Sequence, residues 1–187
     1  MLNTNHRRDI DLAEVNYVIK WYDSIANSYD ELYANDQLLK YEALSKYLSR
    51  DVGNLLDVGC GTGLFLRYLL VNGYRVNYYV CLDVSTEIIK NALSRSRYLN
   101  SLADFIIADL TYPPIREGGL FTYITLITVL RGSYNITGII SKYLRLLKQN
   151  GLILYTVLSK DLSNEAIRYE VIYVKPYASY PELHGSL

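Results

Sequence analysis

The chain has 187 residues, of which half are hydrophobic and a fifth are charged. This length favours a single domain with its own core, and the composition excludes a disordered chain. Basic and acidic residues number 19 each, so the formal net charge is zero. A balanced charge argues against a chain built around nucleic-acid binding, because phosphate binding depends on clustered Lys and Arg.

The sequence shows neither a signal-peptide pattern nor an apolar run of membrane-spanning length, so we expect a cytoplasmic protein without membrane partners. Its two cysteines, Cys60 and Cys81, are too few for a disulfide framework or a zinc site, and we predict no metal. Cys60 lies in a glycine-rich turn and Cys81 in a strand with a buried pattern. We interpret both as reduced thiols, and Cys60 as a packing residue rather than a nucleophile.

Two helices are expected before residue 50. Apolar residues recur at helical spacing from Leu12 to Tyr22, and a second helix is predicted from about Gln37 to Leu48. Asp51-Val52-Gly53 is expected to end this second helix. Its predicted buried positions are Leu38, Leu39, Tyr41, Leu44, Tyr47 and Leu48.

The stretch from Leu55 to Gly63 reads Leu-Leu-Asp-Val-Gly-Cys-Gly-Thr-Gly, and an apolar helical pattern follows at once. This order predicts a strand, a tight turn and a helix. Glycine allows a positive φ and leaves no Cβ between the backbone and a ligand, and the first amides of the helix then face a partly negative group. An ordinary turn without a ligand needs one glycine rather than three at alternate positions.

Two nucleotide-binding patterns do not fit this turn. The sixth position counted from Gly59 is Leu64, where the dinucleotide fingerprint has glycine, and the Lys of an ATP-type loop is missing. The stretch resembles motif I of the class I S-adenosylmethionine-dependent methyltransferases. That resemblance implies S-adenosyl-L-methionine as the cofactor. The cofactor-binding residues that it implies here are Asp57, Gly59, Cys60, Gly61 and Gly63.

The resemblance extends toward the N-terminus. Tyr22 to Tyr33 is similar to the Tyr-Asp-x-Ile-Ala-x-x-Tyr-Asp stretch that precedes the core in many small methyltransferases. In that family the stretch folds over the cofactor as part of a lid, which implies that Tyr22 and Tyr29 lie at the edge of the cofactor or the acceptor. The alternative is an amphipathic helix that packs its tyrosines on the domain, because they also satisfy helical spacing.

The apolar run from Val76 to Val84 predicts a second parallel strand that is buried on both faces. Asp83 lies near its end, about twenty residues after the glycine turn, where an acid can accept two hydrogen bonds from a ribose diol. The family's acid at this place does so, which implies that Asp83 and Val84 bind the cofactor. Ser85 can cap the next helix, predicted from Thr86 to Arg97 with Leu93 among its inward residues.

Phe105 to Leu110 predicts a third strand that ends in an acid. It resembles the family element whose acid meets the adenine amino group. The resemblance implies that Asp109 contacts the adenine and that the backbone around Leu110 lies beside the ring.

Leu120 to Leu130 predicts the fourth strand, and here the sequence departs from the family. Thr128-Val129-Leu130-Arg131 stands where many relatives have a polar residue followed by His or Glu-His. We assign Thr128 to the cofactor-binding set, and the catalytic residues stay unknown. Arg131 either clamps a carboxylate or phosphate of the acceptor or is an ordinary surface residue.

The C-terminal part continues the alternation. Ile136 to Lys148 predicts a helix that Asn150-Gly151 ends, and Gly151 to Ser159 predicts a fifth strand. The remaining residues allow a short helix near Ser163–Arg168 and one strand near Tyr169–Lys175.

Alternating strands and helices predict an α/β fold, a three-layer α/β/α sandwich around a mostly parallel, doubly wound sheet of six or seven strands. We expect one methyltransferase-like domain over 1–187, with 1–50 as a helical lid, 51–160 as the cofactor-binding core and 161–187 as a short C-terminal helix and strand. Right-handed crossovers place the ends of all parallel strands at one edge, where such sheets bind ligands.

The predicted function is an S-adenosylmethionine-dependent methyltransferase that acts on an unidentified acceptor, a small metabolite or a side chain. One alternative is an RNA (tRNA) methyltransferase that works with a partner protein. Another is a catalytically silent cofactor-binding scaffold. An exposed last strand also allows a homodimer.

Overall fold

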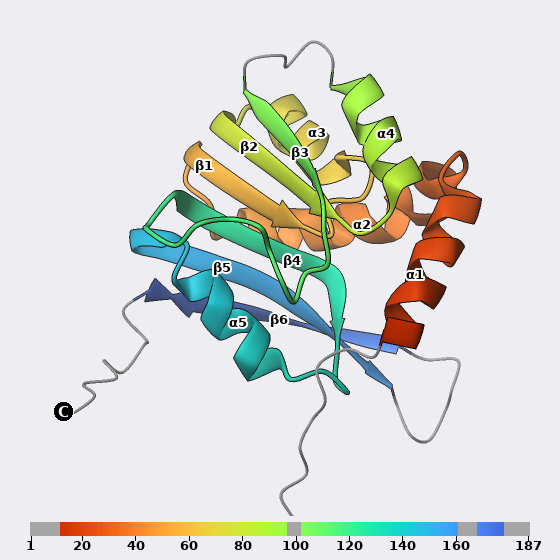
Figure 1. Ribbon diagram of the computed structural model, residues 1–187. Coiled ribbons are helices and arrows are strands. Elements are labelled where there is room, and N and C mark those ends of the chain that lie inside the picture. The colour runs from red at the N-terminus through yellow and green to blue at the C-terminus, as the bar shows by residue number, and fades with distance from the viewer. Residues whose placement is uncertain (1–11, 97–101, 161–167, 178–187) are drawn as a thin grey trace, which may run out of the picture.

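The computed structural model describes residues 12–96, 102–160 and 168–177 (Figure 1). The strands are β1 (Asp51–Val58), β2 (Arg75–Asp83), β3 (Ala103–Ile107), β4 (Phe121–Arg131), β5 (Leu147–Lys160) and β6 (Arg168–Pro176). The helices are α1 (Leu12–Ile25), α2 (Tyr29–Ser45), α3 (Leu64–Val71), α4 (Thr86–Arg95) and α5 (Ile136–Leu144).

All of these strands belong to one six-stranded sheet in the order β3-β2-β1-β4-β5-β6. The first five run parallel to one another, and β6 pairs antiparallel with β5. Helices α2, α3 and α4 cover one face, where Tyr41, Phe65 and Ile89 join a core cluster. Helix α5 covers the other face with Ile139, Ile140 and Tyr143 (Figure 1). The predicted three-layer, mostly parallel α/β fold is confirmed.

Local sequence explains where two helices, α4 and α5, begin. The Ser85 hydroxyl accepts a hydrogen bond from the Ile88 amide at 3.1 Å and caps α4, as predicted. The Asn135 side chain caps α5 in the same way, through a 3.1 Å bond from the Gly138 amide. The central strand β1 is buried over most of its length because helices cover both of its faces.

The second helix differs from the prediction. It begins at Tyr29 rather than Gln37 and ends at Ser45, and Asp51-Val52-Gly53 opens β1 instead of ending the helix. Gly53 has φ +68° and sits at a register shift between β1 and β2, so the glycine marks an irregularity in a strand.

The buried face of α2 also differs from the prediction. Leu38, Leu39 and Tyr47 are exposed, whereas Tyr41, Leu44 and Leu48 are buried as expected. The buried positions within the helix are Gln37, Tyr41, Leu44 and Ser45, which follow helical spacing but include two polar residues. In α4, Leu93 is exposed as well, contrary to the prediction.

Helix α5 is shorter and β5 longer than predicted. The helix ends at Leu144, and β5 begins at Leu147 and continues through Asn150-Gly151. Asn150 has φ +65° and lies at a register shift between β4 and β5, so the pair forms a bulge in a strand rather than a helix end. Leu147 is buried in the core under α5, which favours pairing over another helical turn.

The predicted strand near Tyr169–Lys175 is present as β6. Of the short helix expected near Ser163–Arg168, residues 163–167 lie outside the described residues, and Arg168 belongs to β6. Among the described helices, none has the length and apolar character that a membrane crossing requires.

Candidate functional site

The glycine turn follows β1 at the carboxyl edge of the sheet. Gly59, Gly61 and Gly63 all have positive φ values, +69°, +57° and +81°. A Cβ at Gly59 would lie 2.0 Å from Val129 Cγ1, and one at Gly61 would lie 2.9 Å from the Tyr29 hydroxyl. Glycine is therefore required at the first two positions both for conformation and for space.

Asp83 ties this turn to the end of β2. Its Oδ2 accepts a hydrogen bond from the Gly61 amide at 3.0 Å, and its Oδ1 accepts one from the Ser85 amide at 3.0 Å. Burial raises the pKa of the Asp83 carboxyl, although the amide hydrogen bonds oppose that shift. Val84 lies between Asp83 and Ser85 in the chain, directly after the end of β2.

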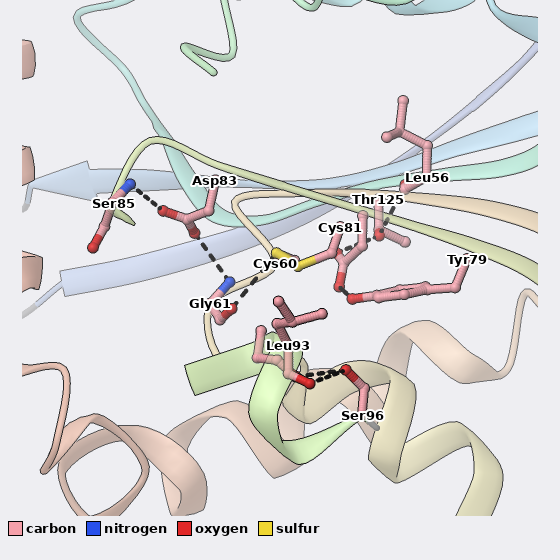
Figure 2. Close-up of a disulfide and its surroundings, with 12 residues drawn as sticks. Leu56, Cys60, Gly61, Tyr79, Cys81, Asp83, Ser85, Leu93, Ser96 and Thr125 are labelled. Atoms are coloured by element: carbon pink, nitrogen blue, oxygen red, sulfur yellow. Dashed lines mark hydrogen bonds between the residues drawn. A yellow bond between two sulfur atoms is a disulfide. The ribbon is translucent and has the colours of Figure 1, made fainter. Parts of the chain in front are cut away.

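Cys60 and Cys81 form a disulfide that joins the turn to β2 (Figure 2). The interpretation of both residues as reduced thiols is therefore wrong. The backbone brings the two together because the Cys60 amide donates to the Leu82 carbonyl at 3.2 Å, which leaves the Cα atoms 5.4 Å apart. Both sulfurs are buried.

The Asp57 side chain lies inside the domain, behind the glycine turn, rather than at the exposed carboxyl edge of the sheet. It is buried, and its carboxylate accepts hydrogen bonds from the Tyr79 hydroxyl at 2.8 Å and the Thr125 hydroxyl at 2.7 Å. Burial raises the pKa of Asp57 to about 6, against the lowering effect of these two hydrogen bonds. In this arrangement the side chain supports the end of β1 from beneath.

Asp109 and Leu110 follow β3, which ends at Ile107 rather than at Leu110. The Ala108 amide donates to the Asp83 carbonyl at 2.9 Å, so this segment lies beside the end of β2. Asp109 Oδ1 accepts from the Thr111 amide and the Thr111 hydroxyl, each at 2.6 Å. Asp109 thus shapes a tight turn next to Asp83.

Thr128 lies in a bulge near the end of β4 and has φ +63°. A β-branched residue is strained in this region, and such strain is most often kept at functional sites. The Thr128 amide donates to the Thr156 hydroxyl at 2.7 Å, which fixes the bulge to β5. The strand ends therefore bring the glycine turn, Asp83, Asp109 and Thr128 to one edge of the sheet.

Tyr22 and Tyr29 approach this edge from the N-terminal helices. Their ring centroids are 6.0 Å apart, and Tyr33 continues the row at 5.1 Å from Tyr29. The Tyr29 ring packs against Gly61, and burial raises its pKa above the ordinary value for a phenol. Tyr29 is thus placed directly over the glycine turn.

A family model described as a methyltransferase domain matches residues 56–155, which include the turn, the ends of β1 to β4 and the first part of β5. The chain belongs to the class I S-adenosylmethionine-dependent methyltransferases. The match excludes α1 and α2, so the helices that carry Tyr22 and Tyr29 lie outside the profile.

The chain is similar to two curated relatives, one of them an uncharacterized protein and the other a methyltransferase. The methyltransferase domain is 28% identical to the uncharacterized protein MJ1252 of Methanocaldococcus jannaschii, over 82% of this chain and 54% of the relative. It is 31% identical to malonyl-[acyl-carrier protein] O-methyltransferase 2 of Ilyobacter polytropus, over 87% of this chain and 61% of that enzyme. The chain therefore spans between one half and two thirds of these relatives.

A solved structure shows the same fold. In a complex from Haloferax volcanii, the protein bound by the Trm112 methyltransferase activator superposes with a TM-score of 0.62 and 19% identity, over 73% of this chain and 59% of that structure.

Sequence reasoning missed two side chains that meet Thr128 in this methyltransferase domain. Gln37 Nε2 and Lys40 Nζ, both on α2, each donate to the Thr128 hydroxyl at 3.1 Å. Lys40 also pairs with Asp36 at 2.6 Å. The available signal was that Gln37 and Lys40 share a helix face with Tyr41 and Leu44. The expected apolar stripe directed attention to Leu38 and Leu39 instead.

Arg131 contacts α1 of the methyltransferase domain. Its guanidinium pairs with Glu14 at 3.1 Å, and the Tyr134 hydroxyl donates to the same carboxylate oxygen at 3.1 Å. Burial raises the pKa of Tyr134 to about 12. The structure thus gives Arg131 a partner on the N-terminal helix.

The N-terminal helices lie closed over the glycine turn. The hollow between Tyr29, Gly59 and Cys60 has a volume of about 10 Å³, which holds about one water molecule. A larger hollow of about 540 Å³ lies between α3 and α4, and Asp83, Asp109 and Thr128 do not line it. Thr62 and Gly63, the last two residues of the turn, line this larger hollow together with Asp30 of α2.

Proposed function

We propose that this domain binds S-adenosyl-L-methionine at the carboxyl edge of the sheet and transfers its methyl group to an acceptor. The observation that supports this most strongly is the joint geometry of the glycine turn and Asp83. Three residues with positive φ expose the backbone there, and the Asp83 carboxylate is hydrogen-bonded to the turn itself.

The donor groups at this edge suit the parts of the cofactor. Amides at the start of α3, which follows Gly63 as its N-cap, suit the carboxylate of the amino-acid part. The Asp83 carboxylate suits the ribose diol, and Asp109 with the Leu110 backbone suits the adenine. Asp57 and Cys60 would act from beneath, by holding the shape of the turn.

When bound, S-adenosylmethionine supplies a methyl group that is already activated on a sulfonium. The work left for the protein is positioning: it aligns the acceptor in line with the methyl and excludes water. Thr128 lies near the end of β4 and is contacted there by Gln37 and Lys40 of α2, so hydroxyl, amide and ammonium groups that can hold an acceptor meet at this point.

We infer a small molecule or a carrier-bound group as the acceptor class. Support comes from the relative that methylates a malonyl group on an acyl carrier protein, and from the balanced charge of the chain. Methylation of a carboxylate needs no proton removal, because the nucleophile is already ionised. A carboxylate accepts hydrogen bonds, and the side chains of Gln37 and Lys40 next to the end of β4 can donate them.

The test is titration calorimetry with S-adenosylhomocysteine, the demethylated product, on the wild type and two variants. Asp83→Ala should weaken binding by about 1–3 kcal/mol, the scale of a lost hydrogen bond to a charged group. Asp51→Ala is the matched control, because Asp51 is exposed at the opposite end of β1. A folded wild type that gives no saturable heat would contradict the proposal.

A second candidate is an RNA methyltransferase that works with a partner protein. The observation in its favour is the structural similarity to the protein that the Trm112 activator binds. The partner would then supply basic surface in addition to that of a chain whose net charge is zero. RNA binding should weaken steeply with salt, whereas binding of a small acceptor should not.

A further inference from the structure

Helix α5 holds the turn that follows β3 through two neighbouring side chains. We call residues 109–112 the β3 turn. The Tyr143 hydroxyl donates a hydrogen bond to the Leu110 carbonyl at 2.6 Å, and Lys142 Nζ donates one to the Thr111 carbonyl at 2.8 Å. Two successive carbonyls of the β3 turn are therefore fixed by two successive residues of α5.

Tyr143 is a rigid anchor for this contact. Its side chain is fully buried in the core cluster between α5 and the sheet, and Leu110 packs against the same cluster. Burial raises the pKa of the Tyr143 hydroxyl above its ordinary value, and the negative charge of Asp109 raises it further. The hydroxyl therefore stays protonated at neutral pH and remains a hydrogen-bond donor.

Lys142 adds a second, charged contact. Its ammonium group lies 4.6 Å from the centre of the Tyr112 ring in addition to its hydrogen bond with the Thr111 carbonyl. The lysine thus contacts the two residues that follow Leu110. Together with Tyr143, it holds the β3 turn along three consecutive residues.

The β3 turn fixes one carboxylate oxygen of Asp109 and leaves the other available. Oδ1 accepts hydrogen bonds from the amide and the hydroxyl of Thr111, and the Tyr112 amide donates to the Asp109 carbonyl at 3.1 Å. Among the hydrogen bonds of the residues that the structure describes, none involves Oδ2. This oxygen is an acceptor whose position is set by the turn, which suits an amino group on a ligand.

We infer that Lys142 and Tyr143 are positioning residues that make the site selective for the base of its cofactor. By holding two carbonyls of the β3 turn, they fix the position of Asp109 Oδ2. This oxygen accepts a hydrogen bond from the amino group of adenine and repels a base with a carbonyl oxygen in its place, because two acceptors would then face each other. The inference rests on the proposed function, in which Asp109 meets the adenine, and adds that base selectivity depends on two side chains of α5 that act through the turn.

The test compares S-adenosylhomocysteine with S-inosylhomocysteine, in which a carbonyl oxygen replaces the amino group of the base. Dissociation constants of both compounds should be measured by titration calorimetry on the wild type, Tyr143→Phe and Lys142→Met. Tyr123→Phe is the matched control, because it removes a hydroxyl that accepts a hydrogen bond from the Ser49 amide at 3.1 Å near the start of β4.

The wild type should bind S-adenosylhomocysteine at least about tenfold more tightly than the inosyl compound, the scale of one hydrogen bond to a charged group. Tyr143→Phe should lower this ratio at least about threefold, because the Leu110 carbonyl loses its donor, and Lys142→Met should lower it at least about twofold. The control should keep the wild-type ratio. Both compounds share their ribose and amino-acid parts, so a general loss of stability changes both constants and leaves the ratio unchanged.

Lys142 is only half-buried, so Lys142→Met keeps the test decisive if Tyr143→Phe does not fold. A wild-type ratio in every folded variant overturns the inference and leaves the proposed function standing. A wild type that binds both compounds equally also overturns it, because Asp109 then does not select the base. A folded wild type that binds neither compound contradicts the proposed function, and the inference with it.

Discussion

The disulfide between Cys60 and Cys81 gives the most quantitative prediction. The two residues are separated by 21 positions, so the bond closes a loop of that size in the unfolded chain. The chain-entropy relation for such a loop gives about 3 kcal/mol of stability at 25 °C. Urea unfolding of the wild type with reductant should therefore show a free energy of unfolding lower by about that amount than without reductant.

The Cys60→Ala/Cys81→Ala double variant serves as the control, because its unfolding should not respond to reductant. A preliminary check is alkylation of the denatured, unreduced wild type followed by mass measurement, which should find no free thiol. If both cysteines are alkylated, or if the reductant changes the free energy of unfolding by less than about 1 kcal/mol, the reasoning is refuted.

Three further predictions concern single side chains. Gly59→Ala should lower the free energy of unfolding by about 2–4 kcal/mol, from a left-handed backbone and a clash with Val129, and adding Val129→Ala should restore part of it in urea titrations. The pKa of Asp57 is raised from 3.8 to about 6 in the fold, so the native state binds more protons than the unfolded chain between these values. Asp57 alone should therefore lower stability by up to about 3 kcal/mol as pH rises from 4 to 7, and Asp57→Asn should remove that part when urea midpoints are compared across pH, while the raised pKa of Asp83 leaves a part of the same sign. Arg131→Ala should cost less than about 1 kcal/mol in the same assay, because its ion pair with Glu14 is partly exposed; a larger loss would mean that α1 is held mainly through this pair.

The order of the core elements could be predicted because local patterns determine it. Strands such as β2 are nearly continuous apolar runs, and glycine turns or Ser caps mark where the helices begin. The wrongly predicted element boundaries lie where a glycine or asparagine with positive φ can either end a helix or form a bulge in a strand. Gly53 and Asn150-Gly151 look like helix ends in the sequence, but each lies in a strand bulge that only the pairing register reveals.

The candidate site was predictable in part for a related reason. Motif spacing located the glycine turn, Asp83 and Asp109, because each follows a strand and the parallel strands end at one edge. Contacts between distant segments were not predictable. Cys60 meets Cys81, Lys40 meets Thr128, and Asp30 meets Thr62 through packing that sequence spacing does not encode.

The hydrogen bond from the Thr128 amide to the Thr156 hydroxyl joins the end of β4 to the neighbouring strand. The unusual backbone of Thr128 is therefore maintained by a side chain that no motif around β4 contains. Anyone who transplants the β4 end from another enzyme to alter acceptor choice will have to choose the residue at position 156 together with it. In this protein, positions 128 and 156 therefore have to be redesigned together.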